Sequence, residues 1–282
     1  MPIKLRLQGI TDLVGPIDRN AIIACYGASQ SGKTTLWLEM LYDLSDQLEK
    51  PALAYDCEGG LAEFVEYWEP IFREAYPKAQ VDVRMKRDYK AILRDHGTTV
   101  VPRYSGTKAK SDDAKKNTSG KTTISVVEEV PVSPISKLIE KKGYCAVLYD
   151  SITMPMKVFG SDQQNFPARA HAQTIWFAEM LNVIDEHGVI VIANHHASKN
   201  PAQPQAAEEM AGGSTVQYYA KIILYLKKPF KAKGVTAYRV LKLARFFNRP
   251  PNEHENLIKL TDKGYVDATT EDLERDREAA KK

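Results

Sequence analysis

The segment GASQSGKTT, residues 27–35, constrains the fold more than any other part of the chain. Glycines stand at its first and sixth positions, and a lysine and two threonines follow the second glycine directly. The uncharged run AIIACY precedes the segment, and TLWLEMLYDLSDQL, with apolar residues at roughly helical spacing, follows it. The pattern G-x-x-x-x-G-K-[ST] between a buried strand and a helix is typical of a phosphate-binding P-loop. The chain is therefore predicted to contain an α/β domain that binds a nucleotide at this loop.

The five letters SGKTT occur a second time, at residues 119–123. Here Lys115 stands where the pattern needs its first glycine, and the polar run KSDDAKKN precedes the letters in place of a buried strand. The β-branched run TTISVVEEV follows where a helix is required. We interpret this second copy as a chance match in a polar loop.

The first copy predicts a site for ATP and Mg²⁺. Glycine allows the backbone to approach phosphate oxygens closely, and the backbone N–H groups at the helix N-terminus attract negative charge. Lys33 is expected to reach the β- and γ-phosphates, and the hydroxyl of Thr34 to bind Mg²⁺. The predicted nucleotide-binding residues are Gly27, Ala28, Ser29, Gln30, Ser31, Gly32, Lys33, Thr34 and Thr35.

Strand-like and helix-like runs alternate along the chain, which predicts an α/β fold with a mostly parallel, doubly wound, twisted sheet and helices on both faces. The last strands, within YAKIILYLKK and AYRVLKLARFF, are predicted to be antiparallel. We expect one domain over residues 1–270. The highly charged tail, residues 271–282, is expected to be a solvated helix or disordered.

Residues 88–132 interrupt this alternation. They are polar and weakly periodic, and residues 81–121 carry eleven Lys and Arg against five Asp and Glu. TTVVPRY and TTISVVEEVPV resemble two strands around a polar tip, so we expect an inserted basic β-hairpin. A long connection of this kind is functional or simply solvated, and contact with a nucleic-acid backbone is the main functional alternative.

Composition limits the compartment and the partners. The net charge of +3 does not by itself indicate a nucleic-acid partner. Cys25, Cys57 and Cys145 fall in predicted strands, which favours buried thiols in a reducing compartment over disulfides or a zinc site. No apolar run approaches the length of a membrane span. We therefore expect a cytoplasmic protein without a membrane partner.

Three further strands end in residues that suit ATP hydrolysis. YCAVLYD ends in Asp150, which is expected to bind Mg²⁺ as a Walker B aspartate. ALAYDCEGGL places Glu58 where it would polarise the attacking water as a general base, although a plain exposed carboxylate is the alternative. GVIVIANHH ends in Asn194, His195 and His196, polar groups suited to sensing a γ-phosphate. Neighbouring strand residues point to opposite faces, which argues against a zinc site at this histidine pair.

In this order, the motifs GASQSGKTT, YDCEGG, VLYDS, IANHH and AGGSTVQYYAKIILYLKK resemble those of the RecA/RadA superfamily. The resemblance covers roughly residues 8–250 apart from the insertion, and is to core-only members, such as short archaeal RadA paralogues and phage RecA-core recombinases. It implies a RecA-like P-loop NTPase core that assembles into a homo-oligomer on single-stranded DNA, with ATP at the subunit interface. It also implies a nucleoid-associated protein of an archaeal, bacterial or phage-infected cell.

The resemblance assigns roles to matching residues. Lys33 and Thr34 correspond to the Walker A pair, Glu58 to the catalytic glutamate and Asp150 to the Walker B acid. His195 takes the place of a glutamine, a departure that some ring helicases share. Lys242 or Arg245 would reach the ATP of a neighbouring subunit, although both also suit a solvated strand. The candidate DNA-binding residues in the two expected DNA loops are Lys157, Phe159, Arg169 and Lys199.

Three hypotheses of function follow. The leading one is an ATPase, stimulated by DNA, that binds single-stranded DNA in recombination, repair or replication. The second is a ring-forming helicase or translocase motor, which His195 and LKLAR favour. The third is a regulatory ATP-binding module that docks on a recombinase or replication protein, favoured because the second DNA loop carries two glutamates and little positive charge.

Overall fold

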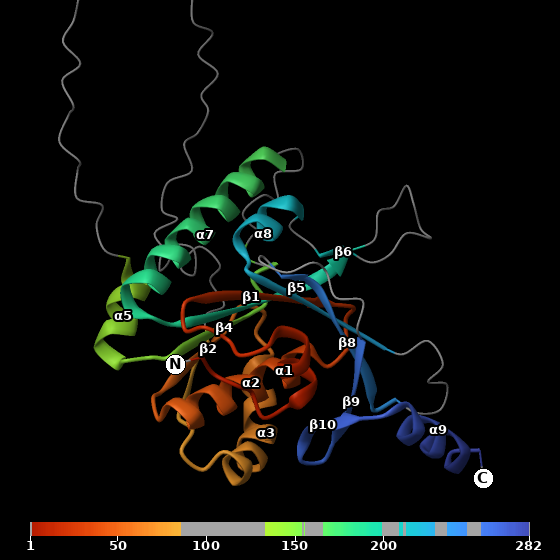
Figure 1. Ribbon diagram of the computed structural model, residues 1–282. Coiled ribbons are helices and arrows are strands. Elements are labelled where there is room, and N and C mark those ends of the chain that lie inside the picture. The colour runs from red at the N-terminus through yellow and green to blue at the C-terminus, as the bar shows by residue number, and fades with distance from the viewer. Residues whose placement is uncertain are drawn as a thin grey trace, which may run out of the picture.

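A twisted β-sheet runs through the molecule, with helices on both of its faces (Figure 1). The computed structural model describes residues 2–85, 133–153, 155, 166–198, 209–210, 213–228, 236–246 and 255–281. The strands are β1 Ala21–Gly27, β2 Ala52–Asp56, β3 Val81–Met85, β4 Ala146–Asp150, β5 Ile190–Ser198, β6 Glu209–Met210, β7 Ile222–Lys227, β8 Tyr238–Phe246, β9 Glu255–Thr261 and β10 Gly264–Ala268. The helices are α1 Gln8–Val14, α2 Lys33–Leu48, α3 Leu61–Ala75, α5 Pro134–Lys142, α7 Phe166–His187, α8 Gly213–Tyr219 and α9 Thr270–Ala279.

The strand order is β10-β9-β8-β7-β1-β5-β4-β2-β3, with the short β6 paired to β5 outside this path. The neighbours from β7 to β3 pair in parallel. Strands β7, β8, β9 and β10 pair antiparallel in sequence order. The predicted α/β fold, mostly parallel with an antiparallel end, is confirmed. The inserted hairpin predicted at 88–132 lies outside the described residues, as does the second SGKTT copy.

Two hydrophobic cores cover the two faces of the sheet. Ile23 and Cys25 of β1 pack with α1, α2 and α3, whereas Ile22 and Ala24 pack with α5, α7 and α8. This division follows from the alternation of side chains along a strand, and Figure 1 shows the two groups of helices on opposite sides of the sheet. All three cysteines are free and buried, as predicted.

Local signals explain where the helices begin and end. Helix α5 starts at Pro134, after Ser133, whose hydroxyl accepts the N–H of Ser136 at 3.3 Å, and it ends at Gly143 with φ of 71°. The charged tail forms helix α9, whose first turn is closed by a capping box between Thr269 and Asp272. No helix in the described ranges combines the length and the apolarity that crossing a membrane requires. The domain boundary at residue 270 stays a prediction.

Candidate active site

The P-loop leaves the carboxyl end of β1 and leads directly into α2. Gly32 adopts φ of 87° and Gln30 φ of 59°, left-handed conformations that turn the backbone around the loop. Lys33 begins α2 and is only 8% exposed. Its ammonium donates hydrogen bonds to the carbonyl oxygens of Gly27 at 3.0 Å and Ala28 at 2.8 Å. The lysine therefore lies over the loop that is predicted to hold phosphate.

Gly27 is required by the close approach of another strand. A Cβ at this position would lie 2.2 Å from the backbone oxygen of Leu226 in β7. We expect Gly27→Ala to lower the free energy of unfolding by about 1–3 kcal/mol, because a backbone atom cannot rotate away from the added methyl group. The measurement is urea unfolding. Gly60→Ala is the control, because an added Cβ there meets nothing within 4 Å; equal losses in both variants would contradict the packing argument.

Asp150 joins the P-loop helix to the neighbouring strands. At the end of β4, its Oδ2 accepts a hydrogen bond from the Thr34 hydroxyl at 2.8 Å, and its Oδ1 accepts one from the Asn194 amide. Burial raises the pKa of Asp150, and these two hydrogen bonds partly oppose that rise. A divalent cation would favour the ionised carboxylate, so Thr34 and Asp150 together offer the oxygen ligands that Mg²⁺ prefers.

Two buried polar atoms without partners indicate whether this site fits a nucleotide and a metal. Ser31 Oγ in the P-loop and Asn194 Oδ1 beside Asp150 have no hydrogen-bond partner in the described part of the chain. Buried polar groups are nearly always hydrogen-bonded. These two atoms, with the Thr34 hydroxyl and the Asp150 carboxylate, fit a site that receives a polar ligand and a hard cation.

Glu58 lies in the turn between β2 and α3. The carboxylate of Asp56 fixes this turn, because it accepts hydrogen bonds from the backbone N–H groups of Glu58 at 3.0 Å, Gly59 at 2.6 Å and Leu61 at 3.0 Å. The side chain of Glu58 is 38% exposed, which leaves it open to water.

Two neighbours hold the Glu58 carboxylate. Its Oε1 accepts a hydrogen bond from the Ser151 hydroxyl and lies 2.7 Å from His196 Nε2. Burial by itself raises the pKa of Glu58, but the hydrogen bonds from His196 and Ser151, together with the charge of Lys33, outweigh it and lower that pKa. Glu58 is therefore an ionised carboxylate, held in place at the same end of the sheet as Asp150.

The histidine beside Glu58 is His196, the neighbour of His195, which stands at the position of the glutamine in the resemblance. Tyr26 pairs with His195 and Gly27 with His196 in the ladder between β1 and β5. His195 is only 1% exposed, whereas the side chain of His196 is 34% exposed. Consecutive strand residues point to opposite faces, and only the pairing of the strands decides which of the two reaches Glu58. The role of His195 in sensing the γ-phosphate during catalysis stays a prediction.

Arg245 lies toward the end of the sheet that is opposite to the P-loop. It pairs with Ile223 near the start of β7, and its guanidinium donates a hydrogen bond to the backbone oxygen of Gln217 in α8. Lys242, nearer the middle of β8, lies with its ammonium 3.7 Å from the Glu255 carboxylate. A role for Arg245 at an ATP site therefore requires a second copy of the chain, and stays a prediction.

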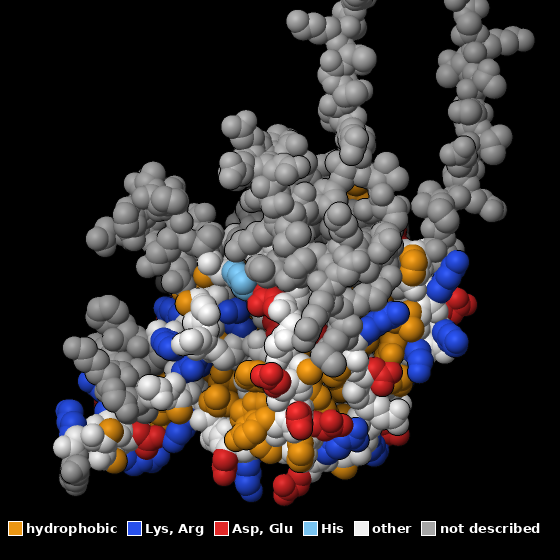
Figure 2. Space-filling model, turned by 180° about the vertical axis from the view of Figure 1, so that it is seen from behind, with side chains coloured by type: hydrophobic (Ala, Val, Ile, Leu, Met, Phe, Trp, Pro, Cys, Tyr) orange, Lys and Arg blue, Asp and Glu red, His pale blue; other side chains and the backbone are white. Residues whose placement is uncertain are grey.

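The predicted DNA-binding residues cannot be placed in the same way. Lys157, Phe159 and Lys199 lie outside the described residues, and Arg169 lies in α7 within the stretch whose side chains are not described. On the face that Figure 2 shows, the basic and acidic side chains of the described residues lie intermingled. The described part of this face therefore presents no continuous basic surface.

Two residues that the sequence analysis missed hold the P-loop from outside. Arg239 of β8 is 7% exposed, and its guanidinium donates to the backbone oxygen of Ser31. The Tyr265 hydroxyl of β10 donates to the backbone oxygen of Gly32 at 3.3 Å. They lie 208 and 233 residues from their partners along the chain, so no local pattern in the sequence marked them.

The strand order and these contacts define the class of the fold. A P-loop follows β1, Asp150 ends β4, and Glu58 follows β2 at the same edge of a mostly parallel sheet. This arrangement is an α/β core with a RecA-like fold.

Comparisons with known proteins agree with this class. The solved structure of the RadB recombinase is similar to the chain with a TM-score of 0.59 and 20% identity, over 93% of this chain and 97% of that one. A KaiC-like protein from the hyperthermophilic archaeon Pyrococcus horikoshii is similar with a TM-score of 0.61 and 11% identity, over 95% and 99%. No protein-family model and no curated protein sequence matches the chain. The similarity is therefore one of fold.

Proposed function

We propose that this protein binds and hydrolyses ATP at the P-loop edge of its sheet. One observation carries the proposal: the Thr34 hydroxyl is bonded to Asp150 at 2.8 Å, and an ionised Glu58 is held at the same edge. A glycine turn that only begins a helix would not need a buried aspartate hydrogen-bonded to the threonine. Nor would it need a second carboxylate held in a fixed orientation.

The chain's own residues supply binding and orientation. The P-loop N–H groups and Lys33 are proposed to hold the phosphates, and Thr34 and Asp150 to hold Mg²⁺. When bound, Mg²⁺ would neutralise phosphate charge that develops during transfer. Lys33 now donates to the carbonyl oxygens of Gly27 and Ala28, so it would exchange these partners for phosphate oxygens.

Glu58 is proposed to take the proton of the attacking water. A general base must be ionised and correctly aimed, and its carboxylate is both, because His196 and Ser151 bind one oxygen and leave the other for water. The geometry favours His196 over His195 as the residue that positions Glu58. His195 stays our candidate for sensing the γ-phosphate from the neighbouring position of β5.

We further propose that the protein binds single-stranded DNA as a homo-oligomer, in recombination, repair or replication. The similarity in fold to the RadB recombinase supports this role. In such an oligomer Arg245 would act on the ATP of a neighbouring copy, which suits its place away from its own P-loop. A cytoplasmic, nucleoid-associated location belongs to the same proposal.

The test is ATP hydrolysis without DNA, with single-stranded DNA and with duplex DNA. We expect Mg²⁺-dependent hydrolysis that single strands stimulate several-fold more than duplex. The affinity for single strands should fall with salt, with a log–log slope of about −0.7 for each phosphate neutralised. Hydrolysis that is indifferent to DNA would overturn the DNA-dependent part and leave a regulatory ATPase. No hydrolysis under any condition would overturn the proposal as a whole.

A further inference from the structure

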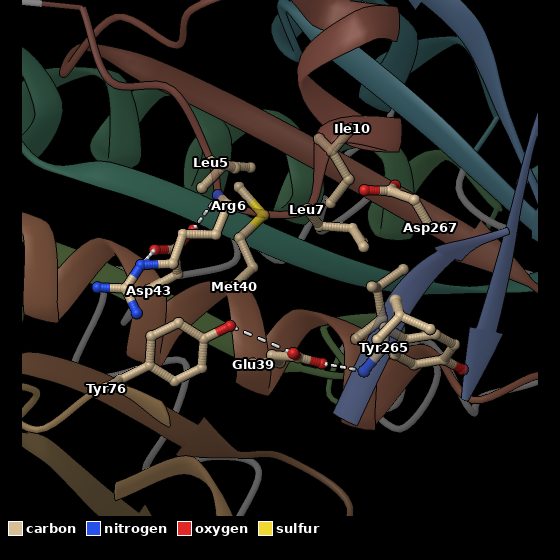
Figure 3. A pocket seen from close by; sticks show the side chains of 12 residues that line it. Leu5, Arg6, Leu7, Ile10, Glu39, Met40, Asp43, Tyr76, Tyr265 and Asp267 are labelled. Carbon is tan, nitrogen blue, oxygen red and sulfur yellow. Dashed lines mark hydrogen bonds and ion pairs between the residues drawn. The ribbon is translucent and has the colours of Figure 1, made fainter. Parts of the chain in front are cut away.

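A cavity lies behind the P-loop helix, away from Glu58 and Asp150. It has a volume of about 210 Å³, well above the ~30 Å³ that one water molecule occupies in the liquid. Its walls come from the N-terminal segment, α1, α2, Tyr76 and β10 (Figure 3). The lining residues are Leu5, Arg6, Leu7, Ile10, Leu36, Glu39, Met40, Asp43, Tyr76, Tyr265, Val266 and Asp267. The cavity is thus large enough for a small organic molecule.

Glu39 gives this cavity a buried negative group. Figure 3 shows its carboxylate between Tyr76 and Tyr265. It accepts hydrogen bonds from the Tyr76 hydroxyl at 3.2 Å and the Tyr265 backbone N–H at 2.7 Å. Glu39 is only 8% exposed, and within the described ranges no lysine, arginine or histidine forms an ion pair with it. Burial raises the pKa of Glu39 to about 7, as expected for a carboxyl group without a counter-ion.

The one basic side chain of the cavity lining is already engaged. Arg6 bonds Asp46, lies 3.5 Å from Asp43 and donates to the backbone oxygen of Ala75 at 2.7 Å. Asp267 is engaged too, because it accepts the backbone N–H groups of Gln8 and Gly9 at the start of α1. Neither Glu39 nor Asp267 has a positively charged partner among the described residues, but Asp267 is exposed to water, whereas Glu39 is buried. The rest of the wall is largely apolar.

The cavity also touches the P-loop through Tyr265. The backbone of Tyr265 binds Glu39, and its hydroxyl binds the backbone oxygen of Gly32. A Cβ on Gly32 would lie 2.1 Å from that hydroxyl, which shows how closely the ring packs on the loop. A shift of Tyr265 would therefore move the turn that precedes Lys33.

We propose that this cavity is an effector site for a small primary alkylamine, whose ammonium group pairs with Glu39 and whose alkyl chain packs against Leu5, Ile10 and Met40. Charge complementarity selects a cation, and the apolar wall selects an alkyl body over a strongly hydrated metal ion. Because Tyr265 joins Glu39 to Gly32, occupation of the cavity changes nucleotide affinity at the P-loop. The site is separate from the proposed hydrolysis of ATP, and it can be tested without nucleotide.

The first experiment measures binding, with n-butylammonium chloride as the probe. n-Butanol is the uncharged control of the same chain length, and sodium chloride the control for ionic strength. We expect saturation-transfer NMR signals and a higher unfolding midpoint with millimolar butylammonium, and neither effect with butanol. In Glu39→Gln both effects of the amine should disappear. Equal effects of the amine in Glu39→Gln and wild type, or no effect in the wild type, would overturn the proposed site.

Glu39→Gln is expected to fold, so its result is informative. The amide retains an acceptor for the Tyr265 N–H, and the Tyr76 hydroxyl can accept as well as donate. The raised pKa of Glu39 means that the folded state binds its proton more tightly than the unfolded chain does. The contribution of the Glu39 carboxyl group to the free energy of unfolding therefore falls as the pH rises from about 4.5 to about 7. At pH 8, replacing this carboxyl group by an amide costs little stability.

The second experiment measures the coupling to the P-loop. The affinity for a fluorescent ATP analogue is measured with and without butylammonium. We expect a change of about fivefold or more in the wild type. Tyr265→Phe keeps the ring and the backbone N–H but removes the hydroxyl, so it should still bind the amine and lose the coupling. Undiminished coupling in Tyr265→Phe would overturn the proposed route, and no coupling in the wild type would overturn the effector role.

Discussion

Glu58→Gln should reduce the turnover number for ATP by about 10²–10⁴-fold, the usual contribution of a general base. The amide keeps the size of the side chain but cannot take a proton from water. ATP affinity should change little, because the P-loop, Lys33 and Asp150 are untouched. Steady-state hydrolysis and equilibrium binding of a fluorescent ATP analogue separate the two quantities.

Glu63→Gln is the matched control for this prediction. Glu63 is an exposed acid in the first turn of α3, five residues further along, and its loss should leave turnover unchanged. Wild-type turnover in Glu58→Gln would contradict the role of general base. His196→Ala, compared with wild type, tests the positioning contact: turnover should fall, and its pH profile should shift, because the 2.7 Å contact that holds Glu58 is lost.

Lys33→Met should weaken ATP binding by about 10- to 150-fold, because a charge-assisted hydrogen bond contributes about 1.5–3 kcal/mol. Turnover should fall by about 10²–10³-fold as well, the cost of removing one donor that stabilises developing charge. Methionine keeps most of the apolar stem, so the change isolates the ammonium group. Both quantities come from the assays used for Glu58→Gln.

Lys50→Met, at an exposed position just after α2, is the control and should behave as the wild type. The Lys33 variant also leaves the carbonyl oxygens of Gly27 and Ala28 without their donor, so its unfolding must be measured beside its binding. A folded Lys33→Met protein with wild-type affinity and turnover would contradict the assignment of the P-loop.

The sequence predicted those parts of the site that depend on short stretches of chain. The P-loop is a contiguous unit of strand, turn and helix, so its residues could be read directly from residues 21–48. Asp150 and Glu58 each follow a buried strand, and the carboxyl ends of parallel strands meet at one edge of a sheet. The sheet then brings Thr34 and Asp150, 116 positions apart, to a hydrogen bond of 2.8 Å.

The choice between His195 and His196 shows where prediction from the sequence stopped. Both follow the same buried strand, and adjacent residues face opposite sides of the sheet. The sequence contains no signal for which face meets Glu58, because that depends on the pairing of β1 with β5 and on the turn that Asp56 organises. His195 stands at the position that the resemblance links to the γ-phosphate, whereas the contact with Glu58 belongs to His196.

By itself, the sequence determined an α/β fold with a P-loop and the strand-end carboxylates beside it, because these depend on hydrophobic period and on short motifs. Only the tertiary structure decided what surrounds the loop. Arg239 and Tyr265 reach it from the antiparallel end of the sheet, and Glu39 lies in a cavity behind it. Such contacts join residues more than two hundred positions apart, and their geometry exists only once the strands have paired.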